Sequence, residues 1–325
     1  MLDQFGRTID YIRISVTDRC NLRCTYCMPE EGVEQFQCKD VLSYEEIIRL
    51  CHIFTSLGIK KVKITGGEPL LRLDICKLIA GIKRIAGIEQ VTITTNGVLL
   101  SAMAENLIHA GIDGINISLD TVKKENFKQL TRRDHLEEVL QGIDKLVQMK
   151  YENIKINCVP ITEVNGDQIA YITSLAKDYP IAVRFIELMP IGMATGYTAI
   201  DKEMLLRIIH NAYGELIPWN GNLGNGPATY FSARGFRGKI GFIEALHSKF
   251  CSQCNRIRLT ANGFLKLCLQ YDMGIDLRYL LRNNADDQYI KIIIEKSIFL
   301  KPREHCFNDN TIGQIDERKM FQVGG

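Results

Sequence analysis

A loop near the N-terminus carries three cysteines that could hold one metal centre. Cys20, Cys24 and Cys27 are spaced C-x3-C-x2-C and directly follow a strand-like run, 11–16. Thiolates are soft ligands, which narrows the metal to iron–sulfur, zinc or copper(I). A 4Fe–4S cube normally takes four cysteine thiolates. Three thiolates therefore leave one iron without a protein ligand, and such an iron could bind a reactant.

Two other interpretations fit the same spacing. Structural zinc sites are closed and four-coordinate, and the loop holds no fourth Cys or His, although Cys38 or a distant residue could supply one. The cysteines could also be small buried hydrophobic residues. Spacing alone leaves iron–sulfur, zinc and chance open.

A second set of three cysteines lies near the C-terminus. Cys251, Cys254 and Cys268 form C-x2-C-x13-C, with the hairpin signal Asn262-Gly263 between the last two. Pairing of the two hairpin arms would bring Cys254 and Cys268 together. His247 could complete a zinc site here. Two sets of three, however, favour two open-site clusters over two incomplete zinc sites.

Basic residues lie on several of the expected strands. Arg256 and Arg258 are separated by one residue and so share one face of a strand. The guanidinium fork suits phosphate or carboxylate, although a solvated basic strand is an equal alternative. Arg13, Lys63 and Lys155 add charge that could face a barrel interior. Buried charge is costly unless paired, and a triphosphate would supply the partner.

Strand-like runs alternate with helical patterns through the first two-thirds of the chain. The expected strands cover 11–16, 61–65, 91–95, 114–119, 154–159 and 181–186. Regular βα alternation implies a parallel sheet with right-handed crossovers. Six units fall short of the eight in a closed barrel. The predicted fold is therefore α/β, a partial (open) six-unit βα TIM-like barrel.

Chemically suggestive residues follow these strands directly. They are the cysteine loop and the segments 66–69, 94–97, 118–120 and 187–190. Active sites of parallel α/β folds assemble at the C-terminal ends of strands. Each segment alone is weak evidence, since Gly, Pro, Asn and Asp also end strands for local turn reasons. Together they predict one site on one rim.

The pattern changes after residue 200. A helix at 202–211 leads to a Gly- and Asn-rich stretch at 220–227. Short strands are expected at 229–232, 239–243, 257–260 and 264–267, and helices at 276–281 and 286–299. We expect a barrel part over 1–200 and an α+β extension over 201–325 that carries the second cysteine set.

Composition limits the class of protein. The chain has 325 residues, 24% charged, and a net charge of +2, which argues against a general nucleic-acid coat. It has no signal-peptide pattern and no run of 18 apolar residues, so we expect a cytoplasmic protein. Eleven cysteines in such a chain indicate metal binding or catalysis rather than disulfides.

Several of these motifs resemble known families. Cys20-x3-Cys24-x-Tyr26-Cys27 resembles the signature of radical S-adenosylmethionine (SAM) enzymes, and Gly66-Gly67-Glu68-Pro69 resembles their segment for the methionine amino group. The second cysteine set with Asn255-Arg256-x-Arg258, and the terminal Gly324-Gly325, resemble the GTP 3′,8-cyclase family of molybdenum cofactor biosynthesis. The resemblance covers nearly the whole chain.

The resemblance implies two 4Fe–4S clusters, each with three Cys ligands. The first would bind SAM at its open iron, and one-electron reduction would give methionine and a 5′-deoxyadenosyl radical. The second would hold the guanine of GTP. The radical would remove hydrogen from ribose C3′, and the carbon radical would attack C8. The product would be (8S)-3′,8-cyclo-7,8-dihydroguanosine 5′-triphosphate.

The resemblance also assigns residues. SAM-binding positions would be Tyr26, Gly66, Gly67, Glu68, Ser118 and Met189. GTP-binding positions would be Arg13, Lys63, Thr94, Lys155, Arg256 and Arg258. Catalytic roles would fall to Arg256, Arg258, Gly324 and Gly325. Lys63 stands where the family commonly has arginine, and a lysine lacks the bidentate fork.

Partners follow from the same resemblance. The enzyme would need an external one-electron donor and would pass its product to cyclic pyranopterin monophosphate synthase, with no membrane or nucleic acid involved. The oligomeric state stays open, with a homodimer as one option. Two rivals remain: another radical SAM enzyme with an auxiliary cluster, such as a peptide-modifying one, and a zinc module that binds nucleic acid through Arg256 and Arg258.

Overall fold

One curved sheet forms the frame of the molecule. The computed structural model describes residues 1–325 except 35, 222, 308–315, 317, 324 and 325. The described strands form a single twelve-stranded sheet in the order β12-β11-β10-β1-β2-β3-β4-β5-β6-β9-β8-β7. The first six are β1 Tyr11–Ser15, β2 Lys61–Thr65, β3 Gln90–Thr95, β4 Gly114–Ser118, β5 Ile154–Cys158 and β6 Ala182–Ile186. The predicted six-strand parallel core is therefore confirmed.

Strands from the C-terminal third extend this core on both sides. They are β7 Leu216–Trp219, β8 Thr229–Ala233, β9 Lys239–Ile243, β10 Arg256–Leu259, β11 Phe264–Lys266 and β12 Gly274–Asp276. β10 pairs in parallel with β1, and β9 pairs in parallel with β6. The outer strands are antiparallel. The sheet curves without closing, so the open partial barrel with an α+β extension is as predicted.

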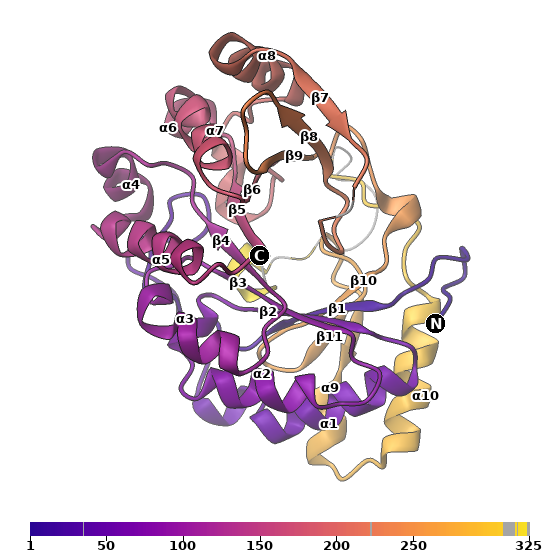
Figure 1. Ribbon diagram of the computed structural model, residues 1–325. Coiled ribbons are helices and arrows are strands. Elements are labelled where there is room, and N and C mark those ends of the chain that lie inside the picture. Colours follow the sequence, from indigo (N-terminus) through magenta and orange to yellow (C-terminus); the bar gives the residue numbers. More distant parts are fainter. Residues whose placement is uncertain (35, 222, 308–315, 317, 324–325) are drawn as a thin grey trace.

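Helices cover the convex side of the sheet (Figure 1). They are α1 Tyr44–Ser56, α2 Ile75–Lys83, α3 Leu100–His109, α4 Lys124–Thr131, α5 Leu136–Gln148, α6 Thr162–Asn165, α7 Ile169–Asp178, α8 Lys202–Tyr213, α9 Leu277–Arg282 and α10 Asp287–Phe299. Across its described residues, the chain has no helix long and apolar enough to cross a membrane.

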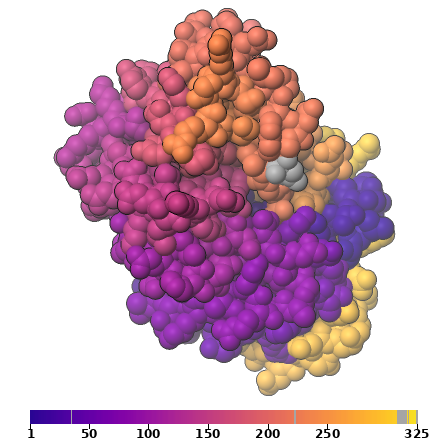
Figure 2. Space-filling view, in the orientation of Figure 1, coloured from indigo at the N-terminus to yellow at the C-terminus, as the bar shows by residue number. Residues whose placement is uncertain are grey.

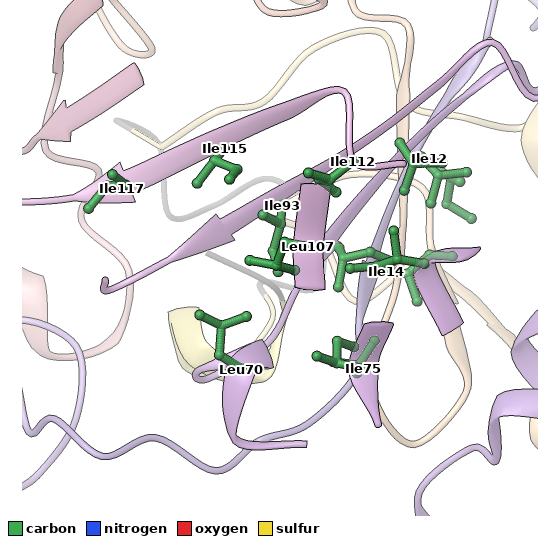
Figure 3. Packing of buried hydrophobic residues seen from close by; sticks show 14 of the residues in the cluster. Ile12, Ile14, Leu70, Ile75, Ile93, Leu107, Ile112, Ile115 and Ile117 are labelled. Atoms are coloured by element: carbon green, nitrogen blue, oxygen red, sulfur yellow. The ribbon is translucent and has the colours of Figure 1, made fainter. Parts of the chain in front are cut away.

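Apolar side chains fill the layer between sheet and helices. Ile14 of β1, Ile93 of β3, Ile75 of α2 and Leu107 of α3 belong to one buried cluster (Figure 3). Full burial of each such side chain contributes about 1.5–3 kcal/mol. Because side chains alternate along a strand, burying Ile14 outward sends Arg13 to the inner face. The core pattern thus decides which residues line the barrel.

The extension meets the first half of the chain at the open side of the barrel. The Asn225 amide donates to Gln90 Oε1 at the start of β3, and the Asn255 amide donates to Asp10 Oδ1 at 2.6 Å. In Figure 2 the orange atoms of the segment around β7 and β8 stand above the purple first half on this face. These contacts bring residues from both ends of the chain around one interior.

Candidate active site

The first cysteine loop is tightly turned at the C-terminal end of β1. The Cys24 carbonyl accepts the N–H groups of both Cys27 and Met28 at 2.9 Å. The Cys20 sulfur accepts the Leu22 N–H at 3.4 Å and the Asn96 amide at 3.7 Å. The Arg23 N–H donates to Thr131 O at 2.9 Å, which fixes the loop to the end of α4.

The three thiols are close enough to affect one another. Burial, followed by Cys27 and Cys20, holds the pKa of Cys24 well above its ordinary range. Burial raises the pKa of Cys20 to about 11 and that of Cys27 to about 12. Burial disfavours the thiolate form of these cysteines unless a positive charge lies nearby. An iron centre supplies that charge, so the donor set fits a metal cluster.

Two glycines after β2 hold this loop in place. The Gly67 N–H donates to Thr17 O, and the Glu68 N–H donates to Arg19 O, both at 2.7 Å. A Cβ on Gly67 would lie 2.3 Å from the Arg19 carbonyl oxygen, and one on Gly66 would lie 2.7 Å from that of Thr17. Only glycine permits this approach. The Gly-Gly pair therefore shapes the loop that carries the first cysteines.

Glu68 is fully buried beneath the same rim. Its carboxylate accepts the Leu70 N–H at 2.9 Å, the Thr95 hydroxyl at 2.8 Å and the Asn96 N–H at 2.6 Å. Burial raises its pKa to about 7, against these hydrogen bonds. The side chain thus links the ends of β2 and β3, beneath the cysteine loop.

Tyr26 connects the loop to the end of β4. Its hydroxyl donates to Asp120 Oδ2 at 2.6 Å, and the Val159 N–H donates to Asp120 Oδ1 at 2.7 Å. Burial raises the pKa of Asp120 to about 6. Ser118 and Met189, both half-buried, lie at the ends of β4 and β6 on the same rim.

The second cysteine set also comes together. Cys251 and Cys254 flank a short turn in which the Cys254 N–H donates to Cys251 O at 3.2 Å. The β10–β11 register pairs Arg258 with Lys266. This pairing brings Cys268 back toward Cys254, as expected from the hairpin signal in the sequence. Burial, helped by Cys268 and Cys254, raises the pKa of Cys251.

Cations surround this second set. Burial raises the pKa of Cys254, but Lys301 and Arg256 outweigh it, so the pKa is lowered overall. Arg7 donates to the carbonyls of Cys251 at 2.8 Å and of Arg303 at 2.7 Å, and it pairs with Asp3 at 2.6 Å. The N-terminal segment therefore fastens the second cysteine turn to the chain after α10. Soft thiolates in a cationic setting again fit an iron–sulfur cluster.

In the parts of the chain that the structure describes, no group of three His, Cys, Asp or Glu side chains lies close enough to hold one metal ion. A 4Fe–4S cube does not need that convergence, because each thiolate binds a different iron. His247 bonds to Glu187 through its ring, where the sequence suggested a possible zinc ligand.

Basic side chains gather beside the second cysteine set. Arg13 is in register with Lys63 on one side and Arg258 on the other. Burial, followed by Arg184, Arg13, Lys155 and Arg256, holds the pKa of Lys63 well below its ordinary range. The five predicted basic residues therefore gather at one place.

The pKa values of this group are depressed by burial. Burial lowers the pKa of Lys155 to about 7, with Arg184 adding to the effect. Lys61, at the start of β2, pairs with Asp10 at 2.7 Å. By contrast, Lys63, Lys155 and Arg184 form no salt bridge with any carboxylate that the structure describes, and Lys155 and Arg184 donate to the neutral side chains of Asn153 and Asn157. A polyanion would relieve both the burial cost and the mutual repulsion.

Arg184 of β6 belongs to this group and was not predicted from the sequence. It is buried, and its guanidinium donates to Asn157 Oδ1 at 2.9 Å and 2.5 Å. The signal was present: a single arginine interrupts the apolar run Ala182–Ile186. Thr94, on β3, is half-buried and accepts the Asn116 amide at 3.4 Å.

The last described residues reach into the same interior. An Arg258 Nη donates to Val323 O at 3.2 Å. The Phe321 N–H bonds to the Cys27 sulfur and partly offsets the rise that burial causes in the pKa of Cys27. The segment Met320–Gln322 thus lies between the two cysteine sets, within the curve of the sheet (Figure 1). Gly324 and Gly325 lie outside the described residues.

Comparisons with known proteins agree with this geometry. The family described as "Radical SAM superfamily" matches residues 14–176, and "Molybdenum Cofactor Synthesis C" matches 181–307. A GTP 3′,8-cyclase of Clostridium perfringens (strain 13 / Type A) is 43% identical over 325 residues, and one of Syntrophomonas wolfei is 45% identical over 329. Both alignments cover 100% of each chain.

Solved structures support the fold. Streptococcus suis SuiB bound to S-adenosylmethionine matches with a TM-score of 0.60 at 16% identity, covering 86% of this chain and 66% of SuiB. At that identity the likeness concerns the fold alone. The full-length relatives, with both family matches, decide the family. The chain belongs to the radical SAM superfamily and, within it, to the GTP 3′,8-cyclase family.

Proposed function

We propose that this protein cyclises GTP to (8S)-3′,8-cyclo-7,8-dihydroguanosine 5′-triphosphate, the first step of molybdenum cofactor biosynthesis. One observation carries the proposal. A buried group of basic side chains lies beside the second cysteine set, and the C-terminal segment that Arg258 holds reaches Cys27 of the first set. A nucleoside triphosphate matches that arrangement, with its base at one cysteine set and its phosphates among the cations.

The cysteines would hold the two clusters. Cys20, Cys24 and Cys27 would ligate the first, and Cys251, Cys254 and Cys268 the second. When bound, the first cluster and SAM supply a radical able to remove a hydrogen atom from a carbon of the substrate. The chain itself provides binding, orientation and exclusion of water.

The protein's own groups orient both molecules. The rim residues Tyr26, Gly66, Gly67, Ser118 and Met189 would contact SAM. Glu68 would support the SAM site from beneath the rim, because its carboxylate already accepts three hydrogen bonds from the protein. The GTP contacts would be Arg13, Lys63, Thr94, Lys155, Arg184, Arg256 and Arg258.

Charge and geometry suggest different tasks for the residues proposed to contact GTP. Lys63 would act as a point charge, whereas the arginines can bind phosphate oxygens in a bidentate manner. Arg258 also holds the Val323 carbonyl, so it would place the C-terminal tail beside the substrate. Catalytic roles for Arg256, Arg258, Gly324 and Gly325 remain part of the proposal.

The surrounding biology is proposed on the same basis. Residues 1–200 would hold the SAM site and five of the GTP contacts, and 201–325 would hold the second cluster and the other two GTP contacts, in keeping with the two family matches. We propose a cytoplasmic enzyme, since none of its eleven cysteines is in a disulfide. An external donor would deliver single electrons, and cyclic pyranopterin monophosphate synthase would take the product. A homodimer would be checked by light scattering.

The test uses anaerobically reconstituted full-length protein with SAM, dithionite and GTP. The expected products are 5′-deoxyadenosine and the cyclised nucleotide. Cys254→Ala should lose about half of the iron, still cleave SAM and form no cyclised nucleotide. Cys38→Ala is the matched control, because Cys38 is exposed and outside both sets. Normal cyclisation by Cys254→Ala would contradict the role of the second cluster.

The same reactions address the rivals. A peptide-modifying enzyme would show no GTP-dependent product, and a zinc module would contain zinc in place of iron and sulfide. The likeness to SuiB, at 16% identity, concerns the fold alone and gives the first rival no support.

A further inference from the structure

The first cysteine loop has an outer neighbour, the helix α4. The Arg23 N–H donates to Thr131 O and the Thr25 N–H to Leu130 O, both at 2.9 Å. Arg132, the residue after α4, donates to the carbonyls of Arg23 and Met28 at 3.1 Å. The end of α4 is thus bonded directly to the backbone that carries Cys24 and Cys27.

The outer face of α4 is strongly basic. The segment 123–133 contains five basic residues and one acidic residue, a net charge of +4, while the whole chain carries +2. Its basic residues are Lys123, Lys124, Lys128, Arg132 and Arg133. We call these five residues the α4 basic surface. Four of them are exposed, and Arg132 is half-buried.

Little of this charge is neutralised. Lys124 lies 3.4 Å from Asp134, and Arg132 lies 3.7 Å from Glu30, both long contacts. Lys123, Lys128 and Arg133 make no salt bridge to a carboxylate within the described ranges. Two cations on α1 and α9 are paired more closely: Arg49 with Asp287 at 2.7 Å and Arg282 with Glu46 at 2.8 Å. The α4 basic surface therefore keeps an outward positive field.

We propose that the α4 basic surface is the docking site of an acidic, low-potential one-electron carrier protein. The proposal rests on the proposed function, which requires single electrons at the cluster held by Cys20, Cys24 and Cys27. In each reduction, the carrier loses one electron and the cluster gains one, with no proton transferred. Docking on α4 places the carrier against the cysteine loop, with the hydrogen bonds of Arg23 and Thr25 between them.

Charge complementarity selects the partner. An acidic carrier is steered toward an unneutralised basic face, which raises the association rate and makes it depend on ionic strength. An uncharged or basic carrier gains nothing there. The net charge of +2 for the whole chain would not by itself attract such a partner. The local surface does.

The test compares two charge-reversed variants of the full-length holoenzyme. Lys123→Glu/Lys128→Glu alters the α4 basic surface, and Lys291→Glu/Lys296→Glu is the control on α10, which lies on another side of the barrel (Figure 1). The probe is an acidic 2Fe–2S ferredoxin. Two quantities are measured at low and high salt: binding of oxidised ferredoxin by calorimetry, and 5′-deoxyadenosine formation with reduced ferredoxin or with dithionite.

We expect the α4 variant to bind oxidised ferredoxin on the order of tenfold more weakly at low salt, and to lose ferredoxin-driven turnover to a similar degree. High salt should remove the difference. Dithionite-driven turnover should be unchanged, which also shows that the variant is folded.

The proposal is overturned if the α4 variant binds ferredoxin as tightly as the unaltered protein, or if the α10 control weakens equally. It is also overturned if the unaltered protein binds RNA oligonucleotides through α4 in preference to ferredoxin. Absence of dithionite-driven SAM cleavage in every protein, including the unaltered one, would instead contradict the proposed function.

Discussion

The Tyr26 hydroxyl donates a 2.6 Å hydrogen bond to the buried carboxylate of Asp120. Tyr26 belongs to the first cysteine motif, and Asp120 follows β4, 94 residues later. The Asp120 backbone carbonyl also accepts the Asn165 amide at 2.8 Å. Because the carboxylate also accepts the Val159 N–H after β5, it ties the cysteine loop to the ends of two strands and orients the tyrosine ring on the rim.

This bond should couple the two residues energetically. Tyr26→Phe keeps the ring but leaves a buried carboxylate with one donor fewer, which costs about 1–3 kcal/mol of unfolding free energy. Asp120→Asn should cost a similar amount. A double-mutant cycle by urea unfolding should give a coupling of about 0.5–3 kcal/mol. Strict additivity of the two single effects would show that the bond does not contribute.

Gly67→Ala should prevent the first cluster from assembling. The new Cβ would lie 2.3 Å from Arg19 O and 2.7 Å from Asp18 O, and backbone atoms cannot move aside without moving the cysteine loop. Iron content should fall by about half, with SAM cleavage lost. Gly226→Ala is the control, since no heavy atom lies within 4 Å of its Cβ position. Full iron loading of Gly67→Ala would refute this account.

Lys155 should make GTP binding pH-dependent. Burial lowers its pKa to about 7 in the ligand-free protein, so the ammonium is present below that pH and is lost above it. Affinity for the triphosphate should therefore weaken as pH rises, by up to about tenfold per pH unit. Lys155→Arg keeps its charge and should flatten the profile of KM against pH. Identical profiles for the two proteins would exclude this role.

Arg184→Ala should raise the KM for GTP by roughly 10–100-fold, because a buried charge-assisted contact to phosphate is removed. Arg184→Lys should recover only part of the affinity, since the bidentate geometry is lost. Cleavage of SAM without GTP should stay at the unaltered rate, which separates substrate binding from the first cluster. An unchanged KM would show that Arg184 serves Asn157 alone.

Local patterns predicted the six core strands, because each alternates or concentrates apolar residues over five or six positions. The helix α4 was missed because Lys124–Thr131 buries only Phe127, Leu130 and Thr131. β7 was missed for a related reason: each of its residues is partly or fully exposed, so no alternation marks it. Elements stabilised by distant contacts leave little local signal.

The site shows the same division. Both cysteine sets and five basic residues were found from spacing and strand position, and the structure gathers each group. Arg184 was missed, and Asp120 was noted only as part of the segment 118–120, because the roles of both depend on which strands lie beside one another. The pairing of β10 with β1 joins residues about 245 positions apart, such as Tyr11 and Arg256. Such a pairing is set by the global packing of the sheet.

That pairing also dictates an order of events on the ribosome. At roughly 5–20 residues per second, β1 waits on the order of 10–50 s for β10 to be synthesised. During that interval the nascent barrel has an open edge at β1, and Arg7 has no Cys251 carbonyl to hold. The N-terminal cysteine loop can meet its supporting glycines early, whereas the C-terminal cysteine turn can be fastened only near the end of translation.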